Sequence, residues 1–189
     1  MSDVSAPAPA GGAIFTIGHS NHPLARLLEL LAAWEIALVV DVRSFPGSRR
    51  WPWFGREALG DALAKAGIAY LWMKELGGRR RVPKGDPGGG AWTSPGFRAY
   101  ASYAAGEEFA HGLERLIEEA ALRRTAVMCA EGLWCRCHRR IIADHLLARG
   151  LLVRHIMPAG GVAEHRLSGP GAGQGAGQPA PGPAPPERG

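Results

Sequence analysis

The sequence predicts one α/β domain with a mostly parallel sheet of about five strands and helices on both faces. Short apolar runs typical of buried strands alternate along the 189 residues with longer segments of helical periodicity. The run 36–42 is apolar almost throughout, as expected for a strand that is buried on both faces of a sheet. Alternating strands and helices imply right-handed crossovers, and such crossovers produce parallel strands.

The first half of the domain is predicted to contain three strands and two helices. Leucines recur at the i, i+3, i+4, i+7 spacing of an amphipathic helix over 23–34, and Pro23 suits its first turn. Gly67 is typical of the residue that ends a second helix. The predicted strands are 13–17, 36–42 and 69–73, and the predicted helices are 23–34 and 56–66.

The second half is predicted to begin with a long loop over 77–93, rich in Gly, Arg and Pro. A loop of this length is uncommon unless it is functional or disordered. Gly150 is expected to end the last helix. The predicted helices are 95–105, 107–122 and 139–149, and the predicted strands are 125–129 and 152–156.

Both ends of the chain are predicted to be disordered, which leaves 13–168 as the folded domain. Segment 1–12 is rich in Ala, Pro and Gly, and 169–189 is almost entirely Gly, Pro, Ala and Gln, so neither has enough apolar area to offset the entropy of ordering. The first residues do not have the pattern of a signal peptide, and no apolar run approaches the roughly 20 residues that span a bilayer. We therefore expect a cytoplasmic protein without a membrane partner.

The net charge is +5, and the basic excess is almost all arginine. The excess reflects either a compositional bias that raises Ala, Gly, Pro and Arg together, or a phosphate-rich partner. Arginine clusters at 49–50 and at 79–81 with Lys84 keep a nucleic-acid partner open. Segment 45–54 mixes arginines with aromatic residues, which either stack on bases and contact phosphates or form an apolar loop with solvated arginines.

The candidate site lies where the predicted strands end. Ligands of open α/β sheets bind at the carboxyl ends of the strands, so polar residues that follow different strands are brought together there. Such residues occur at 18–21, 41–44, 75–78 and 129–131. The candidate site residues are His19, Ser20, Asn21, Asp41, Arg43, Cys129, Glu131, Cys137, His138 and Arg139.

Cys129 is the candidate nucleophile or redox thiol. All three cysteines lie between Cys129 and Cys137, which does not suggest a disulfide framework and favours reactive thiols or metal ligands in a reducing compartment. Backbone N–H groups and a helix that begins soon after the strand would lower the pKa of Cys129, and Arg139 would act in the same direction. The alternative is that Cys129 is a small buried apolar residue.

Cys137 has three interpretations: a resolving thiol for Cys129, a ligand of a metal shared with a histidine such as His19, or a packing residue. The C-x7-C-H spacing is not the tight ligand pair of typical zinc sites, so no metal is predicted. His138 is either a general base or phosphate donor, or a helix-terminal residue with one satisfied hydrogen bond. Cys135 is considered incidental.

His19, Asp41 and Arg43 are predicted to complete the pocket, and Gly18 allows a turn or a close backbone approach beside His19. Asp41 and Arg43 share one side of their strand, so they either form a buried ion pair or position a substrate. We favour a substrate-facing Arg43. Glu131 is a candidate general acid or base.

Several separated motifs carry a family resemblance. They are TIGHSN at 16–21, VDVRSFPGSRR at 40–50, ELGG at 75–78, MCAE at 128–131 and CHR at 137–139. In this order they resemble the domain-of-unknown-function family numbered 488, over about 14–165. Glu164 and His165 would match an acidic-histidine pair near the C-terminal end of that family. The resemblance implies a compact α/β fold and supports the site residues, but it implies no particular reaction.

The predicted function is an enzyme that uses thiol-dependent chemistry at Cys129 on a small anionic or nucleotide-like substrate. His138 and Arg139 would bind or protonate the anionic group, and no cofactor is predicted. The sequence contains neither a P-loop nor a G-x-G-x-x-G fingerprint. Two alternatives remain: a nucleic-acid-binding or processing protein that uses its arginine and aromatic loops, and a binding module with structural or metal-ligating cysteines. The oligomeric state is not predicted.

Overall fold

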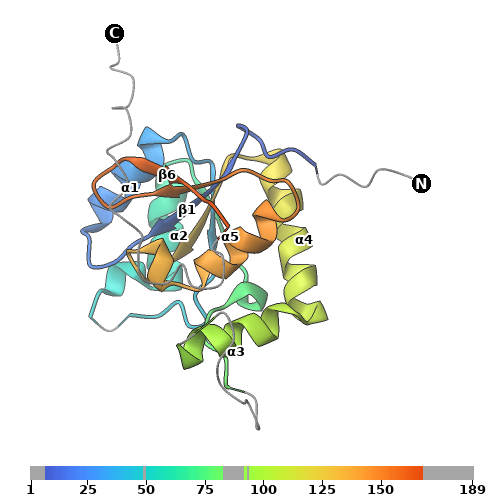
Figure 1. Cartoon of the computed structure of the whole chain (residues 1–189). Helices are drawn as coiled ribbons and strands as arrows, with labels where there is room; N and C mark the ends of the chain where they lie inside the picture. Colours follow the sequence, from blue (N-terminus) through green and yellow to red (C-terminus); the bar gives the residue numbers. More distant parts are fainter. Residues whose placement is uncertain (1–6, 49, 83–91, 93, 168–189) are drawn as a thin grey trace.

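A computed structural model describes residues 7–48, 50–82, 92 and 94–167, and a six-stranded sheet runs through their centre (Figure 1). The strand order is β3-β2-β4-β1-β5-β6. The first five strands are parallel, and β6 pairs antiparallel with β5 at one edge. The strands are β1 (Ile14–Gly18), β2 (Leu38–Asp41), β3 (Ala69–Trp72), β4 (Thr125–Cys129), β5 (Val153–Ile156) and β6 (Val162–Glu164).

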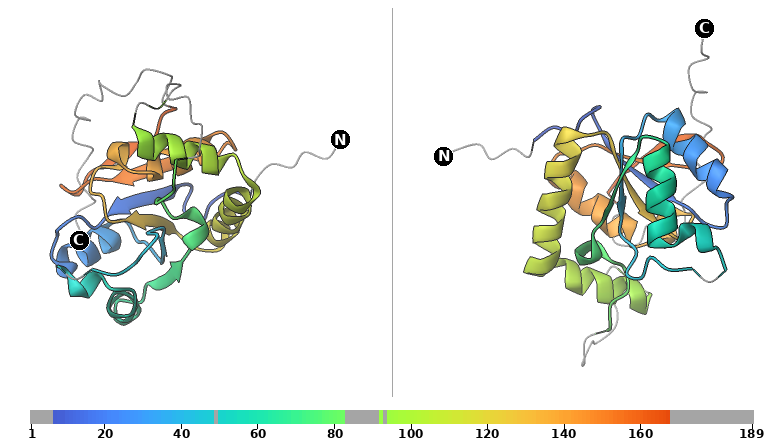
Figure 2. Two further views of the ribbon diagram at one scale, coloured as in Figure 1. Left: turned by 90° about the horizontal axis from the view of Figure 1, so that it is seen from below. Right: turned by 180° about the vertical axis from the view of Figure 1, so that it is seen from behind.

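Helices cover both faces of this sheet, as the two views of Figure 2 show. They are α1 (Leu24–Ala33), α2 (Arg56–Lys65), α3 (Pro95–Ala104), α4 (Glu107–Leu122) and α5 (Arg139–Leu147). Val39 packs in the core beneath α1 and α2, whereas its neighbour Val40 packs in the core beneath α3, α4 and α5. Successive strand residues point to opposite faces, so each buried strand contributes to both cores. None of the described helices has the length and apolar content needed to cross a membrane.

The predicted fold class is confirmed, and each predicted helix and strand agrees with the structure to within two residues at either end. Gly67 and Gly150 end their helices with φ angles of 73° and 79°, the left-handed conformation that glycine adopts without strain. The prediction of five strands missed β6, whose three partly exposed or exposed residues are too few to show a periodic pattern. It also missed the 3₁₀ helices η1 (Pro52–Phe54), η2 (Lys74–Leu76) and η3 (Trp134–Arg136).

The predicted disordered segments lie largely outside the described residues. Residues 1–6 and 169–189 are not described, nor are Arg49 and the part of the predicted loop that contains Lys84. Residues 7–12 are described, and the N–H of Ala10 donates a 2.7 Å hydrogen bond to the carbonyl of Ala120 at the end of α4. The described part of the chain therefore includes residues 7–12.

The connections between strands diverge at the carboxyl end of β4. The chain leaves β1 and β2 toward α1 and α2 on one face, but it leaves β4 toward α5 on the opposite face. Because β4 lies between β1 and β2, this divergence occurs on both sides of its end. Open α/β sheets bind ligands at such switch points, and Cys129 is the last residue of β4.

Candidate functional site

Two cysteines and one histidine meet at the carboxyl end of β4, and we call them the Cys-His cluster. Nδ1 of His138 lies 3.9 Å from Sγ of Cys129 and 3.4 Å from Sγ of Cys137. The three atoms all lie within 4.8 Å of one another. Cys137 is buried, whereas Cys129 and His138 are partly exposed. Three residues that the sequence predicted as site residues therefore do come together.

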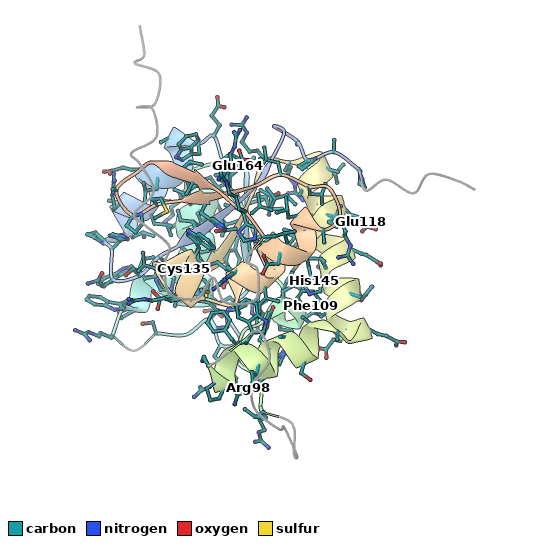
Figure 3. The ribbon with its side chains drawn as sticks, viewed as in Figure 1. Arg98, Phe109, Glu118, Cys135, His145 and Glu164 are labelled. Carbon is teal, nitrogen blue, oxygen red and sulfur yellow. The ribbon has the colours of Figure 1, made fainter. Side chains whose placement is uncertain are left out.

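The cluster is assembled by β4, η3 and the start of α5. The turn of η3 is closed by a 3.1 Å hydrogen bond from the N–H of Cys137 to the carbonyl of Trp134, and His138 is the N-cap residue of α5. Cys135 lies on η3 between the two cluster cysteines in sequence (Figure 3). Its sulfur does not belong to the group that His138 joins with Cys129 and Cys137.

The contacts of His138 show which of its two ring nitrogens carries the proton and which one faces the sulfurs. Nε2 lies 3.1 Å from the backbone carbonyl of Val42. A carbonyl oxygen only accepts, so Nε2 carries a proton. Nδ1 is then the nitrogen that exchanges a proton with Cys129 and Cys137, and the Val42 carbonyl fixes the orientation of the ring.

The two thiols have opposite pKa shifts. The hydrogen bond to Cys137, together with burial, raises the pKa of Cys129 well above its ordinary value. The same hydrogen bond lowers the pKa of Cys137 well below its ordinary value, helped by His138 and Arg139 against the effect of burial. The expected lowering at Cys129 is therefore wrong, because its hydrogen bond to Cys137 and its burial outweigh the effect of Arg139.

Arg139 points inward rather than toward a ligand. Only 1% of the residue is exposed, its Nε donates to Sγ of Cys137 at 3.4 Å, and its Nη2 donates to the carbonyl of Glu131. These bonds hold the loop between β4 and α5 against the cluster. The side chain of Glu131 is exposed, and its Oε1 accepts a 3.1 Å hydrogen bond from the N–H of Leu133.

Asp41 and Arg43 form a buried ion pair, the first of the two alternatives that the sequence allowed. Nη2 of Arg43 donates to Oδ2 of Asp41 at 2.6 Å, and Nε donates to the same carboxylate. Tyr70 donates its hydroxyl to Oδ2 at 2.7 Å, and Nη1 of Arg43 donates to the carbonyl of Phe54 at 2.8 Å. Most donors of the guanidinium are thus occupied within the protein.

His19 packs beside this ion pair. Its Nδ1 lies 2.9 Å from the carbonyl of Ser20, so Nδ1 carries the proton and Nε2 accepts from Nη1 of Arg43 at 3.3 Å. The ring stacks on Phe54 with centroids 4.0 Å apart. Burial and the neighbouring Arg43 lower the pKa of His19 to about 4. Ser20 is partly exposed and Asn21 exposed.

Two adjoining pockets open at this edge of the sheet, with volumes of about 560 and 670 Å³. Cys129, His138, Gly78 and Ala130 line both of them, so the Cys-His cluster forms part of the wall that they share. The first pocket extends along Phe97, Tyr100, Glu131, Arg136 and Cys137. The second extends along His19, Ser20, Arg43, Ser44, Trp51 and Arg79. Among the predicted site residues, Asn21, Asp41 and Arg139 do not line these two pockets.

Two glycines permit close backbone packing around the cluster. A Cβ atom at Gly78 would overlap the ring of His138, and one at Gly18 would overlap the carbonyl of Glu131. The close approach expected at Gly18 is confirmed, whereas the sequence analysis missed the role of Gly78 despite its ELGG motif. The pocket residues Phe97 and Tyr100 were also missed, since helical periodicity does not distinguish a pocket wall from a core.

A second buried group, which we call the histidine chain, links four elements on the same face of the sheet as the cluster. Oγ1 of Thr16 lies 2.7 Å from Nδ1 of His155, whose Nε2 lies 3.0 Å from Nδ1 of His165. Nε2 of His165 lies 2.9 Å from Oδ1 of Asp144. The hydroxyl of Thr16 donates, each ring donates onward through Nε2, and the carboxylate accepts last. The sequence pointed to His165 beside the exposed Glu164 (Figure 3) and to Thr16 within the TIGHSN motif, but not to the chain that joins them.

Fold and site together define an α/β protein with a thiol-imidazole group at the switch point of a parallel sheet. Residues 23–146 match the family described as Domain of unknown function DUF488, and this match covers more than half of the chain, so the protein belongs to that family. The predicted resemblance is confirmed. The match includes the Cys-His cluster but not the TIGHSN motif or His165. No curated protein and no solved structure matches the chain.

Proposed function

We propose that this protein is an enzyme in which Cys129 attacks a small anionic or nucleotide-like substrate at the carboxyl edge of the sheet. The observation that carries this proposal is the position of Cys129, whose Sγ faces Nδ1 of His138 while the residue lines both pockets. A nucleophile beside a base, with the base oriented by a third group, is the arrangement of covalent catalysis. The carbonyl of Val42 is the orienting group.

The chemistry needs only groups that line the pockets. The proton of the Cys129 thiol passes to Nδ1 of His138 as Sγ forms a bond to the electrophilic atom of the substrate. The leaving group departs with the bonding electrons and takes the proton from Nδ1. Arg136 in one pocket and Arg79 in the other supply positive charge for an anionic group.

The remaining predicted residues have supporting roles in this proposal. Glu131 stays a candidate acid or base at the rim of the first pocket. His19 and Ser20 contribute walls of the second pocket. Arg139 and Cys137 position the loop that carries the base. Free thiols at a catalytic site are consistent with the reducing cytoplasm expected from the sequence.

The test is selective alkylation of the metal-free protein with iodoacetamide, read for each cysteine by peptide mass spectrometry at pH 7.5. We expect Cys129 to react about tenfold faster in the wild type than in His138→Gln, since general-base removal costs at least that much. Cys135 lies outside the cluster and serves as the internal control. A Cys129 that reacts only after unfolding in urea would contradict the proposal.

A nucleic-acid interaction is a second candidate, favoured by the loop after β2. Phe45 is 72% exposed, and the guanidinium of Arg50 lies 5.2 Å from the ring centroid of Trp51. Exposed aromatic rings beside arginines are suited to base stacking and phosphate contacts. Binding of labelled single-stranded RNA or DNA should then weaken steeply as salt rises, and binding that does not change with salt would exclude this function.

A further inference from the structure

We infer that the Cys-His cluster also binds one zinc ion, which coordinates Cys129, Cys137 and His138 and leaves a fourth position open toward the pockets. Neither the family match nor the predicted chemistry assigns a metal to these residues. Two thiolates and one imidazole are ligands that zinc prefers. The inference rests on geometry and on the orientation of the histidine.

The spacing of the three donor atoms is close to that of a tetrahedral site. Around zinc, with Zn–S near 2.3 Å and Zn–N near 2.0–2.1 Å, ligand atoms lie about 3.5 to 3.8 Å apart. The observed separations from Nδ1 of His138 are 3.9 Å to Cys129 and 3.4 Å to Cys137. The two distances from Nδ1 therefore differ from the tetrahedral values by only tenths of an ångström, and the two sulfurs lie within 4.8 Å of one another.

The residues around the cluster make the hydrogen bonds that orient the ligands of a metal site. Metal-ligating histidines usually donate their other ring N–H to a carboxylate or carbonyl, and Nε2 of His138 faces the carbonyl of Val42 at 3.1 Å. Nε of Arg139 donates to Sγ of Cys137 and offsets part of the thiolate charge. Gly78 leaves the space that the imidazole occupies.

The open position follows from the pockets. Cys129 and His138 line both pockets and Cys137 lines the first, so a bound ion would be accessible to a small ligand from that side. A structural zinc site has four protein ligands, whereas the site inferred here has three and one open position. Binding of zinc releases the thiol protons to solvent.

Zinc binding and thiol chemistry exclude each other at Cys129, so the ion acts as an inhibitor of the proposed reaction. This regulatory consequence rests on the proposed function, whereas the metal site does not. In the zinc-bound state the lone pairs of Sγ and Nδ1 are directed to the ion. Cys129 is then unable to attack and His138 is unable to accept a proton.

The metal site is tested by titrating the metal-free full chain with Co²⁺, whose thiolate charge-transfer absorption reports sulfur ligation. We expect saturation at one ion per chain and reversal by Zn²⁺. Cys137→Ser and, independently, Cys129→Ser should lower the affinity at least tenfold. Cys135→Ser is the matched control and should bind like the wild type. Circular dichroism confirms that each variant is folded.

The same samples separate the two proposals. Zn²⁺ at one equivalent should slow alkylation of Cys129 at least tenfold and leave Cys135 unchanged. If no Co²⁺ absorption develops, or if Cys135→Ser loses it as well, the metal site is wrong, even when Cys129 alkylates rapidly. If Co²⁺ binds but Cys129 is inert in the metal-free protein, the catalytic proposal and the inhibitory role fail and the metal site stands.

Discussion

The Cys-His cluster and the histidine chain lie on the same face of the sheet but differ in what their polar atoms contact. In the histidine chain, both ring nitrogens of His155 and of His165 have partners within the protein. Trp134 covers His155 with a ring stack of 4.0 Å between centroids. In the cluster, Cys129 faces two pockets. A satisfied, covered network stabilises the fold, whereas the partly exposed Cys129 is accessible to a ligand in the pockets.

Of the substitutions that test this comparison, His155→Ala is expected to cause the largest loss of stability. Removal of this fully buried ring leaves a cavity and unpaired atoms on Thr16 and His165, so the free energy of unfolding should fall by about 3 kcal/mol. Urea denaturation followed by tryptophan fluorescence measures the change. His111→Ala, at an exposed position of α4, should cost less than about 0.5 kcal/mol. A loss below about 1 kcal/mol for His155→Ala would show that the chain does not stabilise the fold.

Acid should destabilise the histidine chain through His155, which its surroundings keep neutral. Burial, assisted by His165 and Arg139, lowers the pKa of His155 to about 2. An unfolded histidine titrates near 6.5, so below that pH the unfolded chain binds a proton that the folded chain does not, and stability falls as pH falls. His155 contributes up to about 1.4 kcal/mol per pH unit from roughly pH 6 downward, because its folded pKa lies far below that range.

The matched measurement is the unfolding free energy of wild type and His155→Gln across that pH range. The wild type should lose stability more steeply, with the remaining slope coming from groups common to both proteins, including His19. Its pKa is lowered to about 4. Parallel curves for the two proteins would show that His155 is not kept neutral by its surroundings.

Gly78→Ala should disturb the Cys-His cluster, with a smaller loss of stability than His155→Ala. Its Cβ would overlap the ring of His138, so the ring must move away from the sulfurs. We expect about tenfold slower alkylation of Cys129 and a loss of about 1 kcal/mol of stability. Gly60→Ala, where a Cβ would lie an ordinary 3.7 Å from Tyr70, controls for the added methyl group. Unchanged alkylation in Gly78→Ala would argue against His138 as the base.

Asp144→Asn should produce the smallest effect. The carboxylate is 18% exposed, and the amide oxygen of asparagine still accepts from Nε2 of His165. We expect a loss of about 1 kcal/mol or less in the free energy of unfolding, measured by urea denaturation. A loss as large as that of His155→Ala would mean that the negative charge, rather than the hydrogen bond, holds the chain together.

The sequence was enough to predict the position of the cluster, because a strand pattern ends at one of its cysteines and a helix pattern begins just after the other. Cys129 ends an apolar run, Cys137 and His138 precede a helical pattern, and the rule for parallel sheets places both at one edge. The sequence did not show which thiol has the lower pKa. That depends on the hydrogen bond between the two cysteines and on the contacts of Cys137 with His138 and Arg139.

The parts that the sequence could not predict depend on contacts between distant elements. The histidine chain joins β1, β5, α5 and the residue after β6, and no spacing along the chain links them. The contacts of Arg43 also come from distant elements, although alternation along the strand predicted that Arg43 and Asp41 share one side. Its ion pair with Asp41 is supported by Tyr70 and Phe54, which lie on β3 and η1.

The position of β1 has a consequence for how the chain folds. This first strand pairs with β4 and β5, so Phe15 lies opposite both Ala126 and Arg154. During synthesis β1 leaves the ribosome before β2 and β3, yet its neighbours β4 and β5 leave after them. Contacts of such long sequence separation slow folding. The centre of the sheet is therefore expected to close only after β5 has emerged, and until then β1 needs protection from pairing with other chains.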